Sequence, residues 1–180
     1  MAEQRTEDLL SGAVAYVLEN GFAGLSLRPL AKELGTSDRM LLYHFTTKGE
    51  LLRLVLARVA DELGAAVDAG VGSAADPPSV IRRLWTTMTA DGVVPYVRAY
   101  LELATLAFHE PETYGAPVRE LTLSWNGFAA TLLESAGVDA SQAPAEAVSV
   151  LGTLNGAFLY WQATDDRAGA DAAVEALANA

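Results

Sequence analysis

The stretch that decides the fold, Ser26–Leu52, reads SLRPLAKELGTSDRMLLYHFTTKGELL. Its apolar residues recur every three to four positions, which is the spacing of short amphipathic helices rather than strands. Ser26 can cap one helix and the pair Thr36-Ser37 can cap the next. Gly35, between them, permits the unusual backbone conformation that a tight turn requires. The pattern therefore predicts a helix, a turn and a second helix over residues 26–44.

The rest of the chain has the same helical spacing, so we predict an all-α fold with about nine helices. A first helix ends at Asn20-Gly21, and the capping-box spacing of Thr47 and Glu50 begins a long helix. That helix ends at about residue 69, before a Gly-, Ala- and Pro-rich linker. Later helices are expected at about 79–90, 94–109, 116–136, 144–164 and 169–178. We expect two domains: a three-helix helix-turn-helix domain at 1–47 and a larger helical domain at 48–180.

The distribution of charge decides whether such a domain could meet DNA. The 180-residue chain has a formal net charge of −11, which by itself argues against a nucleic-acid partner. Residues 1–60, however, hold seven basic and seven acidic residues, and residues 26–58 hold six basic residues against three acidic ones. The acidic excess lies after residue 60, so a locally basic surface remains available for phosphate groups.

In a helix-turn-helix the second helix lies in the major groove and the first braces it. Arg39 is the best candidate for reading a base, because a guanidinium can bind guanine O6 and N7 together. Lys48 falls in the first turn of a helix, where a cation opposes the macrodipole but suits a docked phosphate. Three short helices with glycine turns are, however, a pattern that other proteins share. The residues predicted to contact DNA are Ser26, Arg28, Thr36, Ser37, Asp38, Arg39, Tyr43, His44, Thr47 and Lys48.

The segment Gly24–Leu52 resembles the DNA-binding domain of the tetracycline-repressor (TetR) family of transcriptional regulators. Two positions depart from the family's pattern: Leu42 stands where a tyrosine is usual, and Arg39 replaces a common glycine. The resemblance implies a homodimeric regulator, usually a repressor, that binds a palindromic operator in double-stranded DNA and is released by a small-molecule effector. The residues that carry it are Ser26, Arg28, Ala31, Gly35, Ser37, Leu41, His44, Phe45, Lys48 and Leu51.

Aromatic residues are concentrated in the helices expected between residues 79 and 136. At helical spacing such residues ordinarily form the core, but Trp and Tyr also suit an apolar pocket with a few polar anchors. The family resemblance favours the pocket. Few charged groups lie among these helices, so we expect a largely apolar or aromatic ligand. The residues predicted to bind it are Trp85, Met88, Tyr96, Tyr100, Leu103, Phe108, Trp125, Phe128 and Asn155.

Residues 147–164 contain no charged side chain, and this length approaches that of a membrane span. Polar residues are scattered through the stretch and no basic anchors flank it, so a helix buried on two sides is the better interpretation. One side, with Leu154 and Phe158, would meet the core. The other carries small residues and would allow a second subunit to approach closely. The residues predicted for this dimer interface are Gly152, Gly156 and Leu159.

Other features limit the possible functions. The chain has no cysteine, which excludes disulfides and thiolate metal sites and fits a cytoplasmic location. His109, Glu110 and Glu112 could serve as metal ligands, but they surround Pro111 and are better explained as an exposed helix end. No nucleotide-binding glycine loop is present, so we expect no enzyme and no cofactor. The alternative function is a helix-turn-helix regulator without a small-molecule effector, either constitutive or controlled by a protein partner.

Overall fold

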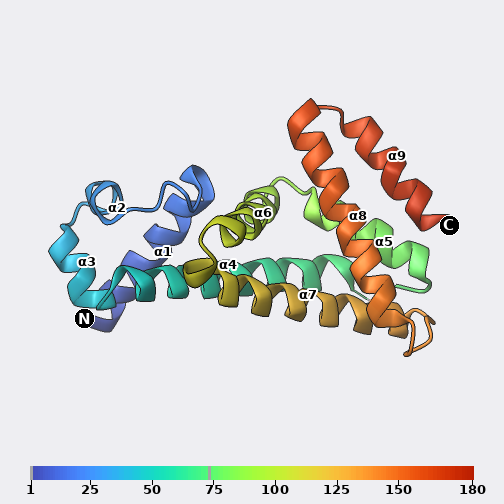
Figure 1. Ribbon diagram of the computed structural model, residues 1–180, viewed down its shortest axis with the longest axis horizontal. Coiled ribbons are helices and arrows are strands. Elements are labelled where there is room, and N and C mark those ends of the chain that lie inside the picture. Colours follow the sequence, from blue (N-terminus) through green and yellow to red (C-terminus); the bar gives the residue numbers. More distant parts are fainter. Residues whose placement is uncertain (1, 73) are drawn as a thin grey trace. The chain divides into compact units, whose positions relative to one another are not determined.

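The computed structural model describes residues 2–72 and 74–180, and every regular element in these residues is helical. The predicted all-α class is therefore confirmed. No helix within the described ranges is long and apolar enough to cross a membrane. The elements, in chain order, are α1 (Ala2–Asn20), α2 (Leu27–Glu33), α3 (Asp38–Phe45), α4 (Lys48–Val71), α5 (Pro77–Met88), α6 (Val94–His109), the π-helical turn η1 (Pro111–Gly115), α7 (Ala116–Ser135), α8 (Ala143–Thr164) and α9 (Arg167–Ala178) (Figure 1).

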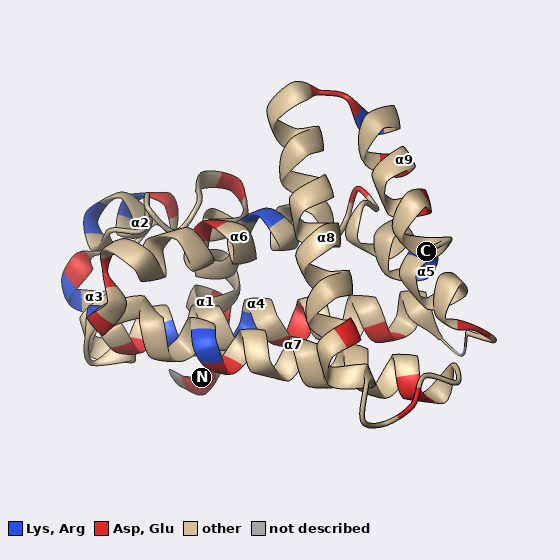
Figure 2. Cartoon of the chain, turned by 45° about the vertical axis from the view of Figure 1, so that its right-hand side comes forward, with Lys and Arg blue, Asp and Glu red and all other residues tan. Residues whose placement is uncertain are grey.

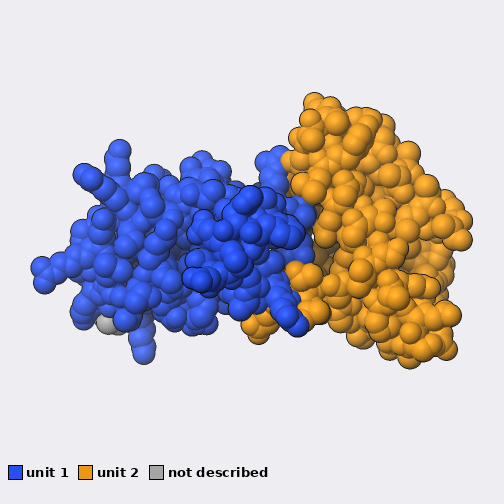
Figure 3. Space-filling view, viewed as in Figure 1, with its two compact units in different colours: residues 1–64, 95–119 blue, residues 65–94, 120–180 orange. Residues whose placement is uncertain are grey.

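Two compact units make up the chain (Figure 3). Unit 1 comprises Met1–Gly64 and Pro95–Arg119, and unit 2 comprises Ala65–Val94 and Glu120–Ala180. The division places nearly all of α6 in the same unit as α1, α2 and α3. The boundary predicted between residues 47 and 48 separates a DNA-binding domain from a ligand-binding domain, whereas the two units are defined by their compactness. The predicted boundary therefore remains a prediction.

The core of unit 1 holds the two short helices in place. Leu30 of α2 and Leu41 of α3 are completely buried, and Phe45 at the end of α3 is 1% exposed. Helices of seven and eight residues are too short to be stable alone, so this burial supplies their stability. Ala99 and Leu103 of α6 belong to the same cluster of buried residues.

The turn between α2 and α3 is closed by two backbone hydrogen bonds. The amide of Thr36 donates to the carbonyl of Ala31 at 2.9 Å, and the amide of Gly35 donates to the carbonyl of Lys32 at 3.3 Å. This is the Schellman arrangement, which requires a left-handed residue directly after the helix. Gly35 supplies it with φ of +62°. The turn predicted from the glycine is therefore present.

The helix caps agree only partly with expectation. Ser37 caps α3 by accepting the amide of Met40 at 3.3 Å, whereas Ser26 occupies the N-cap position of α2 without a side-chain bond. The hydroxyl of Thr47 accepts the amide of Glu50 at 3.0 Å. The return bond of a capping box is absent among the described residues, because the carboxylate of Glu50 pairs with Arg53 at 2.7 Å. A neighbouring guanidinium thus replaces the backbone amide as its partner.

Several helix boundaries differ from those expected. α4 continues to Val71 instead of about residue 69, and α5 begins at Pro77 instead of residue 79. Asp76 explains the earlier start, because its carboxylate accepts the amide of Ser79 at 2.7 Å and caps the helix. The π-helical turn η1 was not predicted. Pro111 indicated only that α6 ends there.

α6 is tied to α4 by a polar link within unit 1. The phenol of Tyr96 donates to the carboxylate of Glu62 at 2.7 Å. Burial and the neighbouring carboxylate together raise the pKa of Tyr96 to about 12, because both disfavour the phenolate. A second link joins α1 to α4, where Arg58 pairs with Glu7 at 2.8 Å.

In unit 2, α9 packs against both α5 and α8. The guanidinium carbon of Arg167 lies 4.7 Å from the ring centroid of Trp161 and 5.3 Å from that of Trp85. The same guanidinium donates to Asp171 at 2.7 Å and to Thr89 at 2.9 Å. Because these residues come from three helices and the turn after α5, the cluster fixes α9 in place.

Gly35→Ala should lower the free energy of unfolding by about 1–2 kcal/mol, because the left-handed conformation is unfavourable for a residue with a Cβ. No steric clash contributes, since a Cβ at Gly35 would meet no atom within 4 Å. Gly64→Ala is the matched control, because its site in α4 is equally open and has no positive φ. This variant should raise the free energy of unfolding by about 0.5–1 kcal/mol. Urea unfolding measures both, and equal effects would contradict the turn geometry.

The stability that Tyr96 contributes should fall as the pH rises from 10 to about 12. In this window the unfolded phenol loses its proton, while the folded phenol, with its pKa raised to about 12, keeps it. The unfolded state then binds fewer protons, so the difference in unfolding free energy between the wild type and Tyr96→Phe should shrink. Denaturant titrations across this range measure it. A constant difference would show that the phenol is not protected.

Candidate nucleic-acid interface

α3 exposes the side opposite its buried residues. Leu41 and Phe45 face the core, so successive residues at about 100° intervals place Arg39 and Tyr43 on the outer side. Tyr43 is 75% exposed and Leu42 38% exposed. The outer surface of α3 therefore presents a guanidinium and a phenol one turn apart, both able to donate hydrogen bonds to a groove.

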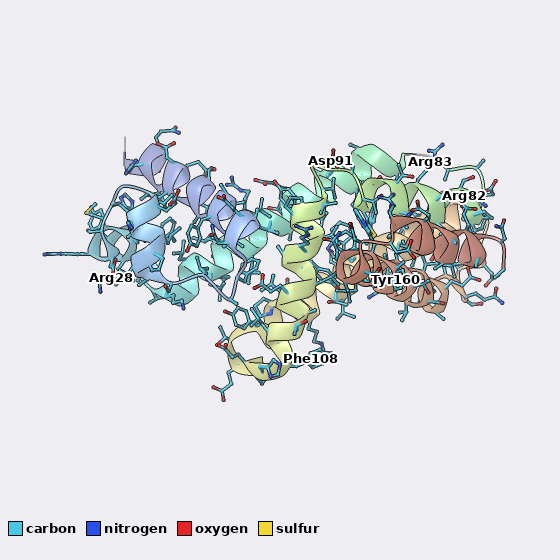
Figure 4. All side chains as sticks on the ribbon, turned by 90° about the horizontal axis from the view of Figure 1, so that it is seen from above. Arg28, Arg82, Arg83, Asp91, Phe108 and Tyr160 are labelled. Atoms are coloured by element: carbon cyan, nitrogen blue, oxygen red, sulfur yellow. The ribbon has the colours of Figure 1, made fainter. Side chains whose placement is uncertain are left out.

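The basic side chains around this helix are available to a ligand. Arg28 and Lys32 of α2, Arg39 of α3 and Lys48 of α4 are all exposed. None of these four cations forms an ion pair within residues 2–72 and 74–180, whereas Arg53 and Arg58 of the same unit are paired. Blue segments on α2 and α3 mark Lys and Arg residues (Figure 2), and Arg28 is labelled on its helix in Figure 4. Unpaired cations on one surface suit phosphate groups.

An open groove of about 860 Å³ lies along α2, the turn and the start of α3. It brings together several of the residues predicted to contact DNA. Lys32 also lines it, although this residue is not among those predicted from the sequence. Its basic charge within the 26–58 window was the signal that could have identified it. The lining residues are Arg28, Pro29, Ala31, Lys32, Thr36, Ser37, Asp38 and Arg39.

Lys48 is the first residue of α4 and is exposed. The helix N-terminus carries partial positive charge, so a lysine there is unfavourable unless an anion binds. The amide groups of the first turn and the ammonium group together form a suitable phosphate site. Thr47 precedes Lys48, and its hydroxyl already accepts the amide of Glu50.

His44 is half-buried and has a structural role. Its Nδ1 lies 2.8 Å from the hydroxyl of Thr6, so the ring joins the last turn of α3 to α1. Ser37 likewise caps α3. Both residues fix the helix that carries Arg39 and Tyr43. Contact of either one with DNA remains a prediction.

The residues predicted to bind a ligand are distributed over both units. Tyr96, Tyr100, Leu103 and Phe108 belong to α6 in unit 1, whereas Trp85, Met88, Trp125, Phe128 and Asn155 belong to unit 2. Leu103 is buried in the core of unit 1. Phe108 projects from the last turn of α6 (Figure 4) and is 85% exposed.

Within unit 2, two of these aromatic residues lie together. Trp125 and Phe128 of α7 are in edge-to-face contact, with ring centroids 6.1 Å apart. The indole N–H of Trp125 is buried and has no hydrogen-bond partner among the described residues. Trp85 differs, because its N–H donates to Asp171 at 2.6 Å. Trp85 is thus occupied in holding α9.

α8 is almost free of charge along its length (Figure 2). Leu154 and Phe158 are buried, as predicted for the inner side. The predicted interface residues Gly152, Gly156 and Leu159 are exposed on the other side, together with Val148. A Cβ added at either glycine would meet no atom within 4 Å. This exposed side is therefore apolar, smooth and open.

No group of three or more His, Asp or Glu side chains within the described ranges could hold a metal ion. His109, Glu110 and Glu112 are all exposed, where α6 gives way to η1.

Residues 9–55, which span most of α1 through the first turns of α4, match the sequence model described as bacterial regulatory proteins, tetR family. Over these residues the chain is similar to the tetR family of bacterial regulatory proteins. An uncharacterized helix-turn-helix-type transcriptional regulator of Mycobacterium tuberculosis is 28% identical over an alignment of 167 residues, with coverage of 86% of this chain and 69% of that protein.

Solved structures match the fold over nearly the whole chain. A transcriptional regulator from Streptomyces coelicolor A3(2) is 26% identical, with a TM-score of 0.72 and coverage of 98% of this chain and 97% of that one. The multidrug binding protein EbrR, solved with imidazole, is 25% identical, with a TM-score of 0.69 and coverage of 97% and 93%. The fold similarity thus extends beyond the helix-turn-helix.

Proposed function

We propose that this protein is a homodimeric repressor of the tetR family that binds a palindromic operator and is released by a small, largely apolar or aromatic ligand. The observation that carries the proposal is the set of exposed cations around α3 that have no ion-pair partner in the described residues: Arg28, Lys32, Arg39 and Lys48. Arg39 and Tyr43 would read base edges in the major groove. Arg28, Lys32 and Lys48 would hold the flanking phosphates.

The exposed side of α8 supports the homodimer. Val148 is 60% exposed and Leu159 is 53% exposed, with Gly152 and Gly156 between them. Such residues allow two helices to approach closely and bury apolar surface. A two-fold axis through this side would relate two copies of α3, and two half-sites one helical turn apart would then form a palindrome.

Two observations support a small-molecule effector. The related EbrR has been solved with imidazole and with proflavin, both of which are aromatic. The buried N–H of Trp125 lacks a partner in the described residues, and such a group is costly unless something accepts its hydrogen bond. An aromatic ligand with an acceptor atom would satisfy it. A panel of aromatic compounds can be screened for operator release, and if none changes operator affinity, the effector-free alternative is favoured.

The operator can be obtained by selecting bound duplexes from a random DNA library with the wild-type protein. We expect a palindrome whose half-site centres lie about 10 base pairs apart or a multiple of that spacing. If the selection enriches no sequence, and binding depends only on the salt concentration, the proposed function is overturned.

Arg39→Ala and Lys48→Ala should weaken operator binding in different ways. Arg39→Ala should cost about 1–3 kcal/mol and relax the preference at one base pair of each half-site, because a base edge loses its hydrogen-bond donor. Lys48→Ala should weaken operator and unrelated duplexes alike and reduce the salt slope by about one for each phosphate that is no longer neutralised. Salt-dependent titrations measure both. A uniform loss for Arg39→Ala would reassign this residue to a phosphate.

Gly156→Glu should prevent dimer formation, because it places like charges opposite each other at the two-fold axis and buries them without partners. The folded monomer should tolerate it, since the site is open and the change removes a glycine from a helix interior. Ala168→Glu, on the exposed surface of α9, is the control with the same added charge. Sedimentation should show a monomer for the first variant only. If both variants sediment as dimers, this side of α8 is not the interface.

A further inference from the structure

The carboxylate of Glu102 in α6 accepts hydrogen bonds from two backbone amides of the loop between α1 and α2. One carboxylate oxygen accepts the amide of Phe22 at 2.8 Å, and the other accepts the amide of Ala23 at 2.9 Å. Glu102 follows these residues by about 80 positions, and both partners lie in unit 1. Hydrogen bonds to an ionised acceptor are stronger than neutral ones, so this is a firm contact.

Gly21 allows this contact to form. Its φ of +79° ends α1 and directs the next two amides toward the same point. Successive amides after such a residue form a small concavity that favours anions, and the carboxylate of Glu102 occupies it. A Cβ at Gly21 would lie 2.8 Å from both oxygens of Glu102. Only glycine permits both the conformation and this close approach.

α6 is a well-anchored support for Glu102. Leu103, the next residue, is 1% exposed within the core that also contains Leu30 and Leu41. Tyr96, nearly two turns earlier, donates to Glu62 of α4. The carboxylate therefore projects from a helix that is fixed by burial on one side and by a hydrogen bond to α4.

The loop that Glu102 holds leads directly into the helix-turn-helix. Phe22 is 1% exposed, and the chain reaches α2 at Leu27, five residues later. α2 carries Arg28 and Lys32, which line the groove beside α3. Fixing the amides of Phe22 and Ala23 thus fixes the point from which α2 begins.

We propose that Glu102 is a positioning residue for DNA binding: by holding the α1–α2 loop, it orients α2 and α3 before the operator arrives. This proposal rests on the function proposed above and assigns to α6 a part in DNA affinity that the predicted 1–47 domain does not include. Without these two hydrogen bonds, the loop must be ordered during binding, and the cost of that ordering reduces affinity.

Glu102→Gln gives a decisive test because the loss of charge and the loss of the hydrogen bonds change operator affinity in opposite directions. Removal of a negative charge by itself strengthens DNA binding. Disruption of the two hydrogen bonds weakens it, since the amide side chain has one acceptor and presents a donor to the second backbone amide. We expect operator affinity to fall about 5- to 20-fold, on the scale of ordering one loop. Glu112→Gln, an exposed residue of η1 in the same unit, is the charge-matched control and should show no such decrease.

Gly21→Ala supplies an independent route to the same state. Its Cβ would displace the carboxylate, so operator affinity should fall to a similar extent. The double variant Gly21→Ala/Glu102→Gln should bind little more weakly than either single variant, because both remove one interaction. Additive decreases would overturn the proposal. All titrations use full-length protein at a temperature where circular dichroism shows each variant folded.

Hydrogen exchange separates positioning from simple stabilisation. In the wild type the loop is already ordered, so the selected duplex should change the protection of the Phe22 and Ala23 amides little. In Glu102→Gln the loop is ordered during binding, so by reciprocity the duplex should raise the protection of these amides. A lower melting temperature with unchanged operator affinity and unchanged protection would make Glu102 merely structural and overturn the proposal. Failure of the wild type to select any duplex would instead overturn the proposed function, and the positioning role with it.

Discussion

Burial of one side of α3 is the constraint on which the interface depends. The helix has only eight residues, and Leu41 and Phe45 are both buried. Because a helix turns about 100° per residue, fixing these two side chains fixes the direction of every other one. The outer side then consists of Arg39 and Tyr43, flanked by Met40 and Leu42, which are also exposed. The core of unit 1 thus determines which side chains of α3 are exposed to a partner.

The interface is arranged at some cost to the isolated protein. Lys48 opposes the dipole of α4, and the neighbouring cations Arg28, Lys32 and Arg39 form no ion pair in the described residues. Elsewhere in unit 1, Arg53 and Arg58 are paired. The difference favours a role in binding for the unpaired set, because an anion that neutralises it recovers the missing stability. On the proposed function, the acidic excess after residue 60 would keep other surfaces away from the duplex.

Local signals in the sequence predicted the features that depend on local chemistry. Gly35 indicated the turn, Ser37 the start of α3, and Asn20-Gly21 the end of α1, because caps and left-handed residues act over a few positions. The contacts of Glu102 were not predictable, since a carboxylate about 80 residues from its partners leaves no periodic signal. The attachment of α6 to the helix-turn-helix was missed for the same reason. The aromatic residues could not be sorted into core and pocket, because both uses require the same spacing.

The departures from the family pattern acquire a physical meaning once α3 is oriented. Leu42, in the usual place of tyrosine, lies on the flank at 38% exposure, whereas Tyr43 is 75% exposed on the outer side. The phenol has therefore moved toward the centre of the exposed surface, one turn after Arg39. Leu42 places an apolar group where a tyrosine is usual in the family. An apolar flank can contact a thymine methyl group but cannot hold a phosphate. On the proposed function, phosphate binding would then fall to α2 and the start of α4, where Arg28, Lys32 and Lys48 are exposed.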